Sequence, residues 1–139
     1  MQYFSQIHIE GFRRLFDLKL ELRPLCVLIG ANSSGKTSAL DAFSLLANSA
    51  RGGLKKTLSD LGGIGANLTG GDARWMALKV STTTTDGEPV HYRLALKPQG
   101  VGYEIVDEML YLQTPEPLDR PTARSRPGTL RFLWLATLL

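Results

Sequence analysis

The start of the chain alternates between apolar and polar positions in a way that predicts two β-strands. Apolar residues recur at every second place within residues 3–10 and again within residues 16–22. Residues 25–29 are apolar without a break. Because such a run suits a strand that is covered on both faces, we expect a buried third strand here, with Cys26 as a small buried hydrophobe inside it.

The apolar spacing then changes from that of a strand to that of a helix. It predicts a helix over residues 36–47, which Gly52 and Gly53 would stop. Residues 54–61 form a second, short candidate helix. The glycines in residues 62–71 indicate a loop, because no second phosphate-binding pattern occurs there.

Three further stretches predict strands, at residues 75–81, 90–96 and 103–106. Turn residues separate these stretches at residues 86–87 and 98–100, so we expect an antiparallel meander. Strands followed by a helix and then by a meander indicate the α/β fold class.

The octapeptide at residues 30–37 fits the pattern G-x-x-x-x-G-K-[ST] and stands between the third strand and the first helix. Gly30 and Gly35 let the backbone approach phosphate closely, so that amide N–H groups converge on its oxygens. The N-terminus of the following helix adds positive potential, and Lys36 supplies a mobile charge for the β and γ oxygens. The Thr37 hydroxyl is placed to bind Mg²⁺. The alternative is an ordinary glycine turn between a strand and a helix.

The fold class expected from this motif is an α/β P-loop lobe with an antiparallel β subdomain. The expected nucleotide-binding residues are Gly30, Ala31, Asn32, Ser33, Ser34, Gly35, Lys36, Thr37 and Ser38. The expected metal ligand is Thr37.

Composition narrows the function classes only slightly. The chain has 139 residues, of which 43% are hydrophobic and 21% are charged, and its net charge of +3 is too small to indicate a nucleic-acid partner. A single cysteine excludes a disulfide within the chain, and no apolar run approaches the roughly 20 residues of a membrane span. We therefore expect one cytoplasmic domain without membrane contact.

Residues 7–15, 18–22 and 27–42 resemble the N-terminal lobe of the RecF/SMC/OLD-like group of AAA/ABC-type ATPases, in which Asn32 at the third loop position is typical. The resemblance implies ATP with Mg²⁺, dimerisation of two complete heads and a possible DNA partner. It also implies that Arg13 reaches the nucleotide phosphates, whereas Arg14 is simply solvated.

The same resemblance divides the chain into three parts. Residues 1–112 correspond to the N-terminal lobe, with the meander over residues 73–112, and residues 113–127 form a linker rich in proline and arginine. Residues 128–139 match the second half of the family signature L-S-D-G-T-L-R-F and its apolar helix. Ser125, Arg126 and Pro127 replace the leucine, serine and aspartate of that signature.

Hydrolysis in this family needs an apolar strand that ends in two acidic residues, the Walker B motif, and we find no convincing copy of it. Residues 103–108 imitate it, but Glu104 interrupts the apolar run, so an antiparallel strand is the better interpretation. We therefore expect ATP binding by this chain and hydrolysis only by a complete dimeric head.

Two other functions remain open at this point. A small P-loop kinase would carry its loop within the first dozen or so residues, and the two strands ahead of Gly30 argue against it. A non-catalytic remnant would bind a partner protein through residues 130–139. Asp60 and Gly63 fit D-x-x-G of GTPases, but no N-K-x-D motif accompanies them. His8 and His91 lack metal-ligand spacing.

Overall fold

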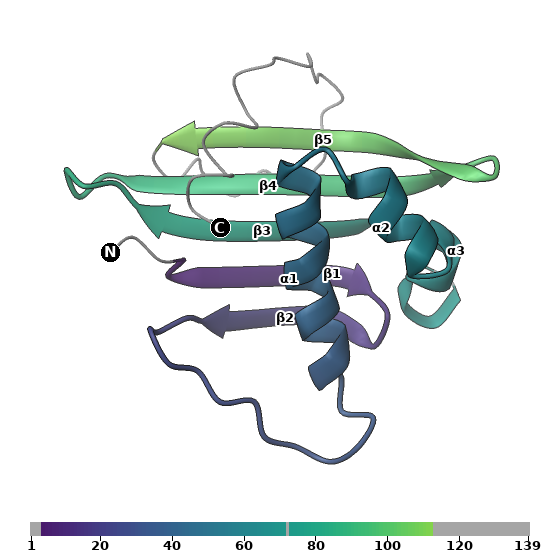
Figure 1. Cartoon of the computed structure of the whole chain (residues 1–139), viewed down its shortest axis with the longest axis horizontal. Coiled ribbons are helices and arrows are strands. Elements are labelled where there is room, and N and C mark those ends of the chain that lie inside the picture. The colour runs from purple at the N-terminus through teal and green to yellow at the C-terminus, as the bar shows by residue number, and fades with distance from the viewer. Residues whose placement is uncertain (1–3, 72, 113–139) are drawn as a thin grey trace.

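The computed structural model describes residues 4–71 and 73–112, in which α1 lies across one face of an antiparallel sheet (Figure 1). The five strands lie in the order β2-β1-β3-β4-β5, and each pairs antiparallel with its neighbours. The strands are β1 Gln6–Phe12, β2 Leu15–Glu21, β3 Met76–Thr83, β4 Pro89–Gln99 and β5 Gly102–Leu112. The helices are α1 Lys36–Ala50, α2 Leu54–Asp60, α3 Gly63–Ala66 and the 3₁₀ turn η1 Thr69–Gly71.

The alternation seen in the sequence becomes the two faces of this sheet. Ile9, Leu78 and Leu94 stand opposite one another on β1, β3 and β4, and all three are almost inaccessible to solvent. The small residues Ala39 and Ala42 on α1 are also buried and belong to the same core. Their short side chains let the helix approach the strands closely. The antiparallel strands expected in residues 75–106 are confirmed as β3, β4 and β5.

The meander is not a separate subdomain. Strand β1 pairs with β3, with Ile7 opposite Val80, so the N-terminal hairpin and the meander share one sheet and one core. The predicted helices at residues 36–47 and 54–61 are present as α1 and α2. The region expected to be a loop, residues 62–71, contains the short turns α3 and η1.

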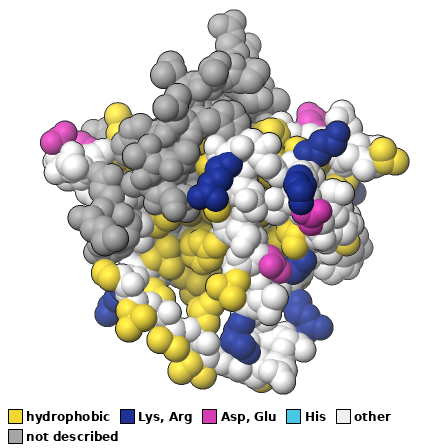
Figure 2. Space-filling model, in the orientation of Figure 1, with side chains coloured by type: hydrophobic (Ala, Val, Ile, Leu, Met, Phe, Trp, Pro, Cys, Tyr) yellow, Lys and Arg dark blue, Asp and Glu magenta, His cyan; other side chains and the backbone are white. Residues whose placement is uncertain are grey.

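The third predicted strand is wrong for the described structure. Residues 25–29 form no strand and are exposed, with Leu25 at 81% and Ile29 at 91% of full accessibility. In Figure 2, hydrophobic side chains gather along the segment that follows β2 in Figure 1. A central strand requires neighbours on both edges, and nothing in residues 4–71 and 73–112 pairs with this segment.

The expectation of a buried Cys26 fails for the same reason. Its side chain is exposed, and its Sγ accepts a hydrogen bond of 3.1 Å from the backbone N–H of Arg23. The predicted linker at residues 113–127 and the signature-like segment at residues 128–139 lie outside the described residues. Among the described helices, none is long and apolar enough to cross a membrane.

Candidate phosphate-binding site

The glycine loop leads directly into α1, and its backbone is left-handed at Ser33 and Gly35. Gly35 precedes the helix with a left-handed φ of 97°, and a Cβ at this position would lie 2.8 Å from Cδ2 of Leu15. Only glycine meets both demands without strain. Ser33 also has a positive φ, of 72°, which the sequence pattern does not reveal.

The first turn of α1 presents open backbone donors to the loop. The first helical hydrogen bond runs from the N–H of Ala39 to the carbonyl of Gly35 at 2.9 Å, and no side chain caps the helix. The amides of Lys36, Thr37 and Ser38 precede this bond, so they have no acceptor within the helix. The helix dipole adds partial positive charge at the same place, and an anion is the natural ligand for such an end.

Lys36 lies over the loop, where only neutral oxygens hold it. Its Nζ donates to the carbonyls of Gly30 and Ala31, at 2.6 Å each, and lies 3.4 Å from Oγ of Ser34. No carboxylate among the described residues forms an ion pair with it. The ammonium charge is therefore available to a phosphate group.

These groups border a pocket of about 240 Å³ beside the helix N-terminus. Six of the predicted site residues line it, and Gly30, Ala31 and Ser34 contribute through their contacts with Lys36. The lining contains no acidic residue. The pocket lining consists of Arg14, Asn32, Ser33, Gly35, Lys36, Thr37 and Ser38.

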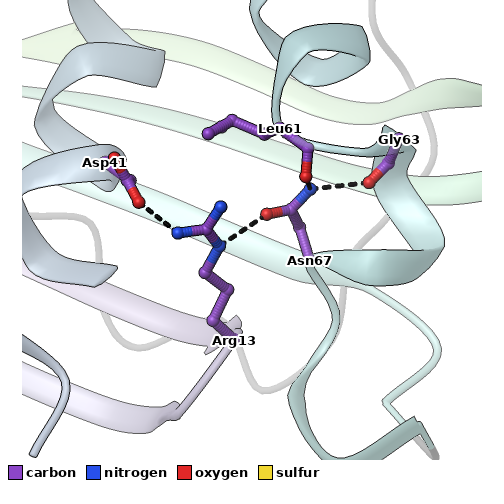
Figure 3. Close-up of polar contacts among 5 residues, drawn as sticks. All are labelled: Arg13, Asp41, Leu61, Gly63 and Asn67. Atoms are coloured by element: carbon purple, nitrogen blue, oxygen red, sulfur yellow. Dashed lines mark hydrogen bonds and ion pairs between the residues drawn. The ribbon is translucent and has the colours of Figure 1, made fainter. Parts of the chain in front are cut away.

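The two arginines of the β1–β2 turn lie in different surroundings. Arg13 does not line the pocket; its guanidinium forms an ion pair with Asp41 on α1, and its Nε donates to Oδ1 of Asn67 at 2.7 Å (Figure 3). Arg14, expected to be solvated, lines the pocket, and its Nη1 donates to the carbonyl of Ser33 at 3.0 Å. The reason is the two-residue turn, in which adjacent side chains point in different directions.

A larger hollow, of about 920 Å³, lies between α2, α3 and the turn that joins β4 to β5. Lys55 and Glu104 are its charged lining residues, and Glu104 already pairs with Lys97 at 2.9 Å. This hollow offers neither a helix N-terminus of useful length nor converging amides. Although it is larger, this hollow is therefore a poorer candidate for binding phosphate than the smaller pocket at the start of α1.

The acidic pair at residues 107–108 is not a Walker B motif in this structure. Both residues lie on β5, an antiparallel strand at the sheet edge opposite β2, as the antiparallel interpretation predicted. Asp107 forms an ion pair of 3.4 Å with Arg93, and Glu108 accepts a hydrogen bond of 3.0 Å from the hydroxyl of Tyr92. Structural contacts therefore account for both carboxylates.

One cluster that sequence spacing missed lies on the sheet face. The Nε2 of His8 is 2.5 Å from a carboxylate oxygen of Asp17 and 3.6 Å from one of Glu10, close enough for a shared cation. Lys19 and Lys79 stand opposite His8 on the two neighbouring strands, and their charges disfavour a divalent ion. The hydrogen bond from His8 also lowers the pKa of Asp17, as expected of an ion pair.

Comparison with known protein families identifies the family to which this chain belongs. Residues 3–93, more than half of the chain, match the family model described as "AAA ATPase domain". The chain belongs to this ATPase family. The expected membership of an AAA-type ATPase family is thereby confirmed, and the match includes the whole glycine loop, α1 and the first three strands of this AAA ATPase domain.

A solved structure supports the same assignment at the level of the fold. The chain is similar to "Structure of the recombination mediator protein RecF-ATP in RecFOR pathway", with 20% sequence identity and a TM-score of 0.56. The similarity covers 80% of this chain and 27% of that one, so this AAA ATPase domain spans about a quarter of the length of that neighbour. No curated protein gives a significant sequence match.

Proposed function

We propose that residues 30–38 bind the phosphate chain of Mg-ATP. The observation that carries this proposal is the absence of acidic residues from a pocket where Lys36, Arg14 and the N-terminus of α1 converge. A site of this charge suits a polyanion, and the family is one of nucleotide-binding ATPases. The similar RecF structure is described as an ATP complex, which supports an adenine nucleotide as the ligand of this chain.

Thr37 fits the role of a magnesium ligand, since it carries a hydroxyl and lines the pocket at the start of α1. No carboxylate lines the pocket, so the nucleotide phosphates and water would supply most of the oxygens that Mg²⁺ prefers. The ion would neutralise part of the phosphate charge. Lys36 and the amides of the first helical turn would hold the remaining oxygens.

Hydrolysis belongs, in this proposal, to a complete dimeric head rather than to the described residues. Phosphoryl transfer to water needs a group that orients the nucleophile in addition to charge neutralisation. Asp107 and Glu108 are engaged on β5, at the sheet edge opposite β2, and do not serve that purpose. A second head would supply the missing groups. DNA is the macromolecular partner that the resemblance to RecF-like ATPases implies.

The binding proposal is tested by calorimetric titration of the full chain with Mg-ATP. Replacing Lys36 by alanine removes a charge-assisted contact, and we expect the binding free energy to weaken by about 2 to 4 kcal/mol. Lys56→Ala is the matched control, because this lysine makes only an exposed ion pair with Asp60 on α2. Equal affinity of wild type and Lys36→Ala would refute phosphate binding by the loop.

A further inference from the structure

The sheet face that is turned away from α1 carries a pocket of about 280 Å³. Side chains alternate between the two faces of a strand, so His8 points away from the core that its neighbours Ile7 and Ile9 share with the helix (Figure 1). Lys19 on β2 and Lys79 on β3 stand directly opposite His8 and line the pocket with it. This pocket shares no residue with the one at the start of α1.

A second row of side chains in the same pocket supplies neutral polar groups. Gln6, Ser81, His91 and Tyr111 stand opposite one another on β1, β3, β4 and β5. Each strand position in this row is two residues from the row of His8, so both rows lie on one face. Among the described residues that line the pocket, none is acidic.

Both lysines of the pocket keep their charges available to a ligand. Neither forms an ion pair with a carboxylate in residues 4–71 and 73–112. Glu10 and Asp17 stand opposite each other on the other side of His8, and both contact its Nε2. The hydrogen bond with His8 is the main cause of the lowered pKa of Asp17, and the charges of the two lysines contribute less. An anion in the pocket would therefore meet two ammonium groups.

His91 carries a buried polar atom that lacks a partner. Its Nδ1 lies 2.8 Å from Oγ of Ser81, whereas its Nε2 is buried and has no hydrogen-bond partner among the described residues. When the Ser81 hydroxyl donates to Nδ1, the proton of the neutral ring resides on Nε2, which is then a donor. A buried donor without an acceptor costs free energy, and an acceptor oxygen beside this ring would remove that cost.

We propose that this pocket binds a phosphate-type dianion through Lys19, Lys79 and His91. Two ammonium groups and an imidazole N–H, with the hydroxyls of Ser81 and Tyr111 beside them, form a set of donors that suits an anion with several oxygens. The volume is close to the lower end of the range for ligand pockets, so the ligand is the phosphate ion or a small phosphomonoester. The proposal does not depend on nucleotide binding by the glycine loop.

The first test follows the imidazole signals of the full chain by NMR during titration with inorganic phosphate at a constant pH of about 7.5. The chain has two histidines, and both line this pocket, whereas neither lines the pocket at the start of α1. We expect saturable shifts with phosphate and with sulfate, but not with sodium chloride of equal ionic strength. Shifts that only follow the ionic strength would overturn the proposal.

The second test compares lysine variants in the same titration. Lys79→Gln and Lys19→Gln should each weaken phosphate binding about 10-fold, because each removes one charge-assisted contact. Lys19 is exposed on the edge strand β2, so its replacement tests the site even if Lys79→Gln lowers the melting temperature. Lys97→Gln is the matched control, since Lys97 pairs with Glu104 outside the pocket. Wild-type affinity in Lys19→Gln would contradict the proposed ligand set.

The third test separates this pocket from the glycine loop and identifies the source of the phosphate. Lys36→Ala should leave the histidine shifts unchanged, and their loss in this variant would place the bound ion at the start of α1 and refute the second site. Tighter binding of glycerol phosphate than of inorganic phosphate would identify a phosphorylated small molecule as the ligand, and the reverse order would identify the free ion. Acetate that binds as tightly as phosphate would refute the phosphate class.

Discussion

The guanidinium of Arg13 pairs with the carboxylate of Asp41 and so joins the β1–β2 turn to the first half of α1. Both side chains are about three-quarters buried, at 26% and 25% of full accessibility. Water screens such a pair only in part, so the contact is stronger than an ion pair on an open surface. The edge hairpin and the helix therefore behave as one unit beside the pocket at the start of α1.

This relationship predicts energetic coupling between the two residues. Arg13→Gln and Asp41→Asn should each lower the free energy of unfolding, and the double variant should lose about 1 kcal/mol less than the sum. Chemical denaturation of the four proteins gives the coupling energy. The exposed pair of Lys56 and Asp60 serves as control and should couple by only about 0.3 to 0.5 kcal/mol. Strict additivity at Arg13 and Asp41 would contradict the ion pair.

Gly11 and Gly52 form a matched pair for a test of close packing. Both have a positive φ, of 68° and 76°, so alanine costs about 1 to 2 kcal/mol of backbone strain at either place. A Cβ at Gly11 would also lie 2.6 Å from the carbonyl oxygen of Trp75, whereas a Cβ at Gly52 would meet nothing within 4 Å. We expect Gly11→Ala to be the more destabilising by a further 1 to 3 kcal/mol or so.

Urea denaturation of the two variants measures this difference directly. Because the strain term is common to both, subtracting one loss from the other isolates the contact between β1 and the start of β3. Equal losses in Gly11→Ala and Gly52→Ala would mean that the backbone at Trp75 moves aside without cost.

His91 predicts how stability depends on pH. Burial lowers its pKa below the usual 6.5, with a smaller contribution from the charge of Lys79, and the ring stacks on Tyr111 at 5.1 Å. A lowered pKa in the folded state means that the unfolded chain binds the proton more readily. The free energy of unfolding should therefore fall as the pH drops below about 6.5.

The measurement compares wild type with His91→Gln by chemical denaturation at about pH 7.5 and about pH 5.5. The variant lacks the titrating imidazole, so its stability should decrease less over this interval. Asp17 does not interfere, because its pKa lies below 3.8 and it titrates at lower pH. An identical pH dependence in both proteins would show that His91 titrates normally.

The local pattern of apolar and polar residues predicts those strands and helices whose formation depends mainly on nearby residues. The period of two in residues 3–10 and 16–22, and the helical spacing after Lys36, correspond to β1, β2 and α1. One buried face determines β1 and α1, whereas on the edge strand β2 only Leu15 is buried and Phe16 is exposed. The last strand is longer than predicted. The polar residues after Val106 suggested its end, but Asp107 continues the edge strand through its pair with Arg93.

Structural features that depend on residues far away in the sequence could not be predicted from the local pattern. The run at residues 25–29 has the composition of a buried strand, yet its state depends on neighbours that no local pattern specifies. The motif spacing predicted a role for the loop and Lys36, but the position of the Arg13 side chain depends on Asp41 and Asn67, which come about 30 and 50 residues later. Adjacent identical residues are distinguished only by the fold.

The pairing of β1 with β3 also governs the order of events when this chain folds. Ile7 and Val80 meet across about seventy residues of sequence, and the glycine loop, α1 and α2 all lie between them. Closing such a segment costs chain entropy before its apolar contacts are gained, and such non-local pairing slows folding. The hairpin and α1 are local and can form early, whereas the core that supports them is complete only after β3 docks. We therefore expect a nucleotide to stabilise only those chains in which β1 has already paired with β3.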